Sequence, residues 1–183
     1  MSWPGESALA TEEYFVRGYQ DMRGLTWDDA YETLKLEKEL IDRYPGDLND
    51  AEETMFETEE DVSGLYGLDL GIASTVVALS AAGCAPVASC NGAPGHHEAY
   101  SLVAFYCRKG RVKDILKATE ISNCGLYNGE SRALVAYGEN VGTLMQFAEV
   151  LIALRESLKS PSRPDRKKYP RKRDKRQLAF DIP

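Results

Sequence analysis

The sequence has no apolar run long enough to cross a bilayer. The longest candidate, Ile72–Ala82, is far shorter than the roughly 20 residues that a spanning helix needs, and most of its side chains are small. The first residues, Met1–Glu6, lack the basic stretch followed by apolar residues that marks a secretory signal. We therefore expect a soluble, cytoplasmic protein with no membrane contact.

Cysteine is scarce in this chain and histidine is scarcer. There are four cysteines and two histidines in 183 residues. The cysteines show neither C-x-x-C spacing nor the tight spacing of a disulfide framework, so we expect reduced thiols. A G-x-C-x-G nucleophile turn is also missing, because Ala88 stands where its first glycine would be.

Charge is plentiful but unevenly distributed. The chain carries 22 basic and 29 acidic residues, a net charge of −7. From position 160 onward there are nine basic and three acidic residues, a net charge of +6, which leaves −13 for positions 1–159. Such an asymmetry between body and tail indicates a protein whose ends contact partners.

The pattern predicts three parts: an acidic helical arm at 1–62, an α+β domain at 63–159 and a basic tail at 160–183 that ends in a hydrophobic motif. Capping residues and helical spacing predict the arm helices, which are Thr11–Arg23, Trp27–Tyr44 and Asp50–Asp61. The domain is expected to hold helices and strands in alternation. The helices are 68–82, 111–123 and 141–158, and the strands are 85–89, 101–107, 126–127 and 132–137. This α-β-β-α-β-β-α order favours a two-layer sandwich, ferredoxin-like or a permuted variant.

The residues best suited to chemistry are concentrated between Val87 and Glu98. This stretch holds both histidines, one cysteine and several turn-forming residues, and a predicted strand lies on each side of it. Proteins often present functional groups on a loop that rigid elements hold in place. One interpretation is a thiol nucleophile, in which Cys90 attacks, His96 or His97 takes its proton, and Glu98 orients the imidazole. The backbone N–H groups that follow the thiol would then form an oxyanion hole.

A metal site is the second interpretation of this stretch. Zinc prefers four thiolate or imidazole ligands in a tetrahedral arrangement, and the candidates are Cys84, Cys90, His96 and His97. Two adjacent histidines rarely reach one ion together. Cys84 also follows the glycine expected to end a helix, where it could be packed as a small apolar residue. We expect the same buried role for Cys107 and Cys124.

The third interpretation involves no covalent chemistry. Ser89 and Asn91 would satisfy backbone groups of the loop, while Gly92 and Gly95 would adopt positive φ. The histidines would then lie on the surface or contact a partner. A related alternative is a binding pocket in which Asn91, His96 and the loop amides recognise a polar ligand.

At Ser89-Cys90-Asn91-Gly92 the chain resembles the N4-methyltransferase family of tRNA wybutosine synthesis, in which a helix also precedes a strand that ends in an S-C-x-G turn. The resemblance covers about residues 68–141. It implies that Ser89, Cys90 and Gly92 line a pocket for a tRNA nucleoside and S-adenosylmethionine. The chain departs from that family at Asn91, where the family has Ser, and at Ala93, where it has Arg. The segment Gly67–Ser74, together with this turn, also resembles bacterial proteins of uncharacterised activity.

These features lead to two functional hypotheses. The first is an accessory or ligand-sensing subunit of a bacterial multi-protein assembly, held through its arm and tail, with nucleic acid as a further partner of the tail. The alternative is an enzyme at Cys90, either a thiol-dependent hydrolase or transferase, or a methyltransferase-like enzyme of RNA modification. The cofactor stays open, with zinc preferred over S-adenosylmethionine. The residues expected to contact a partner or nucleic acid are Arg166, Lys167, Lys168, Arg171, Lys172, Arg173, Lys175, Arg176, Leu178 and Phe180.

Overall fold

The structure is a computed structural model that describes Met22 and residues 24–94, 96, 98–129, 133–156 and 158. The expected helix Thr11–Arg23 lies outside the described residues apart from Met22. The basic tail with all its predicted contact residues also lies outside them, as does His97.

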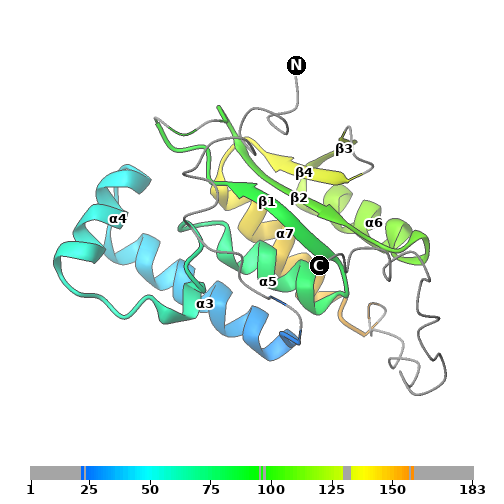
Figure 1. Ribbon diagram of the computed structural model, residues 1–183, viewed down its shortest axis with the longest axis horizontal. Coiled ribbons are helices and arrows are strands. Elements are labelled where there is room, and N and C mark those ends of the chain that lie inside the picture. The colour runs from blue at the N-terminus through cyan, green and yellow to red at the C-terminus, as the bar shows by residue number, and fades with distance from the viewer. Residues whose placement is uncertain are drawn as a thin grey trace, which may run out of the picture.

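The described part of the chain begins with helices and continues with two pairs of strands, each followed by a helix (Figure 1). The order of the elements is α3 (Trp27–Arg43), α4 (Leu48–Glu57), η1 (Ser63–Leu65), α5 (Ala73–Ala81), β1 (Ala85–Cys90), β2 (Ser101–Tyr106), η2 (Lys109–Arg111), α6 (Val112–Ser122), β3 (Gly125–Asn128), β4 (Leu134–Gly138) and α7 (Val141–Ala153). The expectation of an α+β fold with helices packed on an antiparallel sheet is confirmed.

The four strands form one antiparallel sheet in the order β1-β2-β4-β3. Helices α5, α6 and α7 lie along one face of this sheet, and α3 packs against α5 and α7 from the outer side (Figure 1). No helix in the described part of the chain has both the length and the apolar character to cross a membrane.

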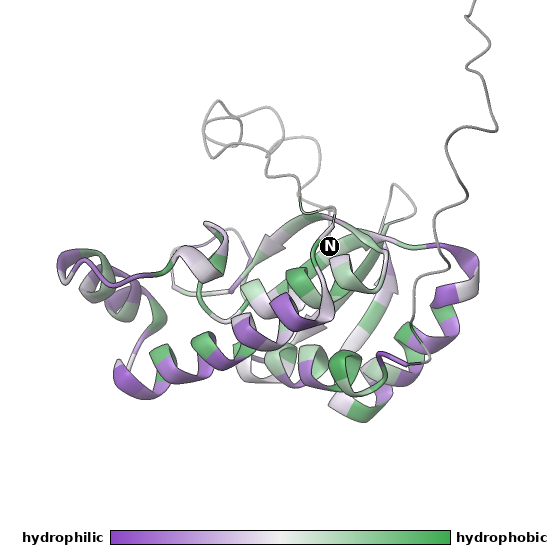
Figure 2. Cartoon of the chain, turned by 90° about the horizontal axis from the view of Figure 1, so that it is seen from below, coloured by the Kyte–Doolittle hydropathy of each residue, from purple (hydrophilic) through white to green (hydrophobic). Residues whose placement is uncertain are grey.

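The main core lies between the sheet and its helices. Alternate residues of β2, Val103 and Phe105, point into this core, to which Phe147 of α7 also belongs, as expected for a strand with one face buried. Ala30 and Leu34 of α3 belong to the same core. Helix α3 lies in the region expected to form an arm, and it packs against the domain through these residues. In Figure 2, hydrophilic residues dominate the left side, where α4 lies, and hydrophobic residues dominate the sheet.

Helix α5 begins five residues later than the expected start at Leu68. The chain between Leu68 and Ile72 forms turns, and Gly71 has a φ of +83°. Val141 packs so closely against Gly71 that a Cβ added to this glycine would lie 2.5 Å from the Cβ of Val141. No side chain next to α5 caps its first turn. Glu37 of α3 takes that role and accepts hydrogen bonds from the N–H groups of Ala73 and Ser74 at 2.8 and 3.1 Å. The start of α5 is thus set by a residue far away in the sequence.

Candidate functional site

The predicted loop after β1 folds into two consecutive tight turns. Cys90 is the last residue of β1, and the N–H of His96 donates to the carbonyl of Ala93 at 3.0 Å. Pro94 follows Ala93, at the position of a β-turn where its fixed φ is favourable. The Asn49 side chain at the start of α4 donates to the Pro94 carbonyl at 2.7 Å, and this bond holds the loop against α4.

These turns bring the thiol and one imidazole together. Cys90 Sγ and His96 Nδ1 are 3.7 Å apart, within hydrogen-bond range for sulfur. The N–H of Gly92 also donates to Cys90 Sγ, at 3.4 Å. Cys90 is 9% exposed and His96 is partly buried, so the pair lies at the surface with restricted access to water. A thiol with a neighbouring base and a backbone donor is the arrangement that activates cysteine nucleophiles.

Gly92 is required for this geometry. Its φ is +72°, and a Cβ there would lie 2.6 Å from the carbonyl carbon of Tyr100 and 2.8 Å from the backbone nitrogen of Ser101. Only glycine tolerates both the backbone conformation and the close approach of the returning strand. The contact holds the end of β1 against the start of β2.

Asn91 stabilises the turn through hydrogen bonds to two neighbouring residues. It is buried, its Oδ1 accepts from the N–H of Ala93 at 3.1 Å, and its carbonyl accepts from the Ser101 hydroxyl at 2.6 Å. Its Nδ2 lies 3.4 Å from Glu52 of α4, whose carboxylate also accepts from the N–H of Leu70 at 2.7 Å. The predicted ligand-binding residue Asn91 is therefore engaged in holding the loop.

The thiol lies on the sheet face opposite the helices. Cys90 packs with Leu102 and Val135, which alternate with the residues of the main core along their strands. Leu102 pairs with Tyr137 across the sheet, and Tyr137 pairs with Gly125. The thiol thus begins a row of side chains that crosses this face of the sheet.

Three tyrosines form an aromatic cluster on that face. The ring of Tyr137 lies 5.7 Å from that of Tyr100 and 5.6 Å from that of Tyr127, in tilted and edge-on arrangements that aromatic pairs prefer. Burial raises the pKa of Tyr127, and Tyr100 and the charge of Glu98 raise it further. Glu98 therefore lies near the tyrosines, and within the described residues it makes no hydrogen bond with His96. Sequence reasoning missed this cluster, although strand alternation could have placed Tyr127 and Tyr137 on the face of Cys90.

Other predicted site residues lie elsewhere. Ser89 pairs with Val103, a core residue, and thus faces the helices and not the thiol. Cys84 precedes β1, so the strand separates it from Cys90 by about 20 Å. The proposed zinc set of Cys84, Cys90, His96 and His97 is therefore corrected: Cys84 cannot share an ion with Cys90. Among the residues that the structure describes, no three His, Cys, Asp or Glu side chains are placed to hold a metal ion.

The three remaining cysteines, Cys84, Cys107 and Cys124, are partly buried and pack against the main core. Burial raises the pKa of Cys84 to about 12 and also raises the pKa values of Cys107 and Cys124. Thiols of this kind stay protonated near neutral pH and react slowly.

Comparisons with models of known protein families, with curated proteins and with solved structures found no match. The resemblance at Ser89–Gly92 stays a prediction.

Proposed function

We propose that the protein is a thiol-dependent hydrolase or transferase with Cys90 as nucleophile and His96 as its base. The observation that carries this proposal is the 3.7 Å separation of Cys90 Sγ and His96 Nδ1 in a turn that other side chains hold in place. The raised pKa values of the other three thiols support the choice of Cys90.

The proposed reaction is acyl transfer through a thioester. His96 Nδ1 takes the proton of the Cys90 thiol, and the thiolate adds to a carbonyl carbon of the substrate. The bond from that carbon to the leaving group breaks, and the leaving group takes the proton from His96. Water, or another acceptor with an O–H or N–H group, then attacks the thioester and returns the proton to Cys90. The Gly92 N–H, which donates to Sγ in the resting state, stabilises negative charge at the sulfur.

The surroundings of the thiol favour an apolar acyl group. The neighbouring side chains Leu102 and Tyr100 pack against Cys90, and Tyr137 follows Leu102 in the same row. Transfer of apolar surface onto these groups is favourable by about 25 cal/mol per Å². We therefore propose esters or thioesters of aliphatic or aromatic acids as the substrate class.

We also infer that the fold is a permuted variant of the ferredoxin-like sandwich. The element order α5-β1-β2-α6-β3-β4-α7 and the antiparallel sheet order β1-β2-β4-β3 support this. Within the described part of the chain, the helices pack on one face of the sheet, and the opposite face carries the thiol and the tyrosines.

The test is the reaction of the full chain with nitrophenyl esters of acetic, butyric and octanoic acid. We expect a burst of nitrophenol equal to the protein concentration, a mass increase of one acyl group on Cys90, and faster reaction with the longer acids. Cys90→Ser should abolish the burst, and His96→Asn should slow it about 100-fold or more, as loss of a general base does.

Cys107→Ser is the matched control and should retain the burst, because that thiol is partly buried, packs against the main core and has a raised pKa. Acyl groups found on residues other than Cys90, or an equal burst in the His96→Asn protein, would refute the proposal.

A second candidate function is the accessory subunit expected from the charge distribution. The observation in its favour is Phe56, which is 87% exposed on the acidic helix α4. Aromatic side chains, including phenylalanine, are enriched in protein–protein interfaces relative to the rest of the surface. Native mass spectrometry of the purified protein tests it. A stoichiometric partner that is lost in Phe56→Ser supports an accessory role, and a bare chain contradicts it.

A further inference from the structure

A groove lies between α4 and the chain that follows it. Its volume is about 420 Å³, within the range of sites that hold small molecules or the anchor residues of a peptide. Buried side chains Met55, Leu65 and Leu70 form the apolar floor. Phe56 and Val62 stand exposed at its rim.

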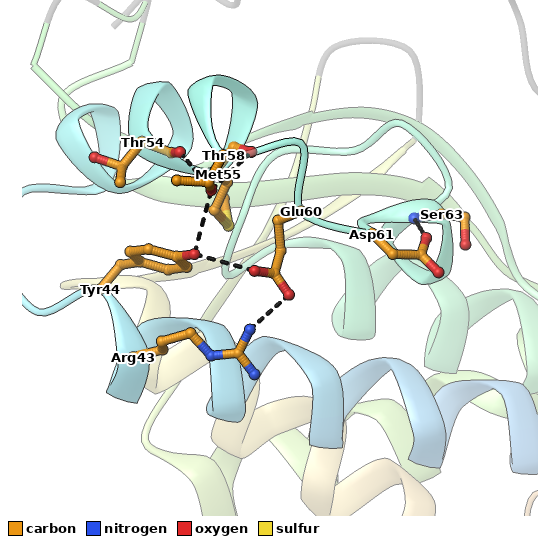
Figure 3. Close-up of polar contacts among 8 residues, drawn as sticks. All are labelled: Arg43, Tyr44, Thr54, Met55, Thr58, Glu60, Asp61 and Ser63. Atoms are coloured by element: carbon orange, nitrogen blue, oxygen red, sulfur yellow. Dashed lines mark hydrogen bonds and ion pairs between the residues drawn. The ribbon is translucent and has the colours of Figure 1, made fainter.

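The polar lining of the groove is acidic. Glu52, Glu59, Glu60 and Asp69 line it, and among the residues that the structure describes no lysine or arginine does. Glu60 is held by Arg43 of α3 at 2.5 Å and by the Tyr44 hydroxyl at 3.0 Å, as Figure 3 shows. These bonds fix the end of α4 against α3, so the groove has a defined wall.

The groove is complementary to the end of the chain. Residues 171–183, RKRDKRQLAFDIP, contain five basic and two acidic residues and then the apolar side chains Leu178, Phe180 and Ile182. An acidic rim around an apolar floor matches such a peptide in both charge and hydropathy. The body and the tail also carry net charges of opposite sign, −13 and +6.

The tail is long enough to reach the groove. Leu158 is buried in the main core beyond the end of α7, and Leu178 lies 20 positions further along the chain. Twenty extended residues span about 66 Å, whereas a domain of this size is about 40 Å across.

From these observations we propose that the C-terminal segment 171–183 docks in the acidic groove of its own chain. Leu178 and Phe180 occupy the apolar floor beside Phe56, and the basic residues before them pair with the acidic rim. This inference is independent of the proposed acyl-transfer chemistry.

Carbodiimide crosslinking of the full chain tests the docking directly, because the reagent joins lysines to carboxylates that touch. We expect amide crosslinks from Lys172 or Lys175 to Glu59 within single molecules, in a yield that does not change with protein concentration. The yield should fall severalfold in high salt, which screens exposed charges.

Hydrogen exchange of Leu48–Glu57 is the second measurement. With Leu178→Asp and Phe180→Asp together, this helix should exchange about tenfold faster, since it loses the contact that covers it. Tyr169→Asp, in the same tail but outside the docking segment, is the matched control and should leave the exchange unchanged. On the groove side, Phe56→Ser should reproduce the effect, whereas Ile121→Ser, at an exposed position of α6, should not.

Three results would overturn the docking. The first is crosslinks from the tail only to carboxylates outside the groove. The second is crosslinks only between two molecules, which would assign the groove to a second copy. The third is exchange of Leu48–Glu57 that the double substitution does not alter.

Discussion

The carboxyl group of Glu37 makes the stability of the fold depend on pH. It is fully buried under the first turn of α5, and its two oxygens accept from the N–H groups of Ala73 and Ser74. Two effects compete there. Hydrogen bonds at a helix N-terminus favour the carboxylate, while burial favours the neutral acid. Burial is the larger effect and raises the pKa of Glu37 from 4.5 to about 7, although bonds from Ser74 and Ala73 lower it.

The direction of the pH dependence follows from this raised pKa. The folded protein holds the Glu37 proton more tightly than the unfolded chain does, so the contribution of this group is complete below about pH 4.5. It is lost as the pH rises through about 7. The full difference in the free energy of unfolding is about 3 kcal/mol.

The substitution Glu37→Gln isolates this effect. Glutamine keeps an oxygen that accepts a hydrogen bond from α5 but cannot ionise. The Glu37→Gln protein therefore lacks the loss of stability that ionisation of Glu37 causes at high pH. Relative to the parent protein, we expect the stability of Glu37→Gln to improve by about 3 kcal/mol between about pH 4 and about pH 9. Urea unfolding of both proteins across that range measures the difference.

Glu32→Gln is the matched control, since it removes an exposed carboxyl group from the same helix. It reports how much of any change comes from net charge alone. Two results would show that our reasoning is wrong. One is a constant difference between the free energies of unfolding of the parent and of Glu37→Gln across the pH range, and the other is a loss of stability of the variant relative to the parent as the pH rises. Either result would mean that the helix N-terminus, and not burial, decides the pKa of Glu37.

Two further predictions concern single side chains. Gly92→Ala should lower the free energy of unfolding by about 3 kcal/mol, because the new Cβ meets the backbone of Tyr100. Gly110 has open space around it, so Gly110→Ala should change the free energy of unfolding little. Equal effects of the two substitutions in urea unfolding would contradict the close approach at Gly92. Ser74→Ala should change the free energy of unfolding by less than about 1 kcal/mol, because the buried Ser74 hydroxyl lies near the Glu37 carboxyl, whose pKa it lowers, but has no partner at hydrogen-bond geometry within the described part of the chain. Thr75→Val, which removes a 2.8 Å bond to a carbonyl of α7, should cost about 1 kcal/mol, and a similar loss in Ser74→Ala would reveal a missed partner.

Local signals in the sequence predicted most of the elements. Thr26 and Asp29 form the capping box that starts α3, and Asn140 caps α7 by accepting from the N–H of Thr143 at 3.1 Å. The apolar run that begins at Ser101 is followed by charged residues, and the bounds of β2 nearly coincide with those of the run. In each case, the residues that decide the boundary lie within one turn of it, so no tertiary contact is needed to find it.

Boundaries and site geometry that depend on distant residues were not predictable. The small residues before α5 are compatible with a helix, but Gly71 at positive φ and the carboxyl of Glu37 set its start. Similarly, the sequence names Cys90 and His96 as candidates but does not place them together. Their distance depends on the contact of Gly92 with a strand that begins nine residues later.

Glu52 links the groove to the turn that carries Cys90. Its side chain lines the groove, accepts from the N–H of Leu70 and lies 3.4 Å from the amide nitrogen of Asn91. Asn91 in turn accepts from the N–H of Ala93, whose carbonyl positions His96. A segment that docks in the groove therefore touches the side chain at the start of this chain of bonds. Docking changes the reactivity of the thiol only if it alters how Glu52 holds Asn91, because a ligand shifts a distant site by its differential contacts alone.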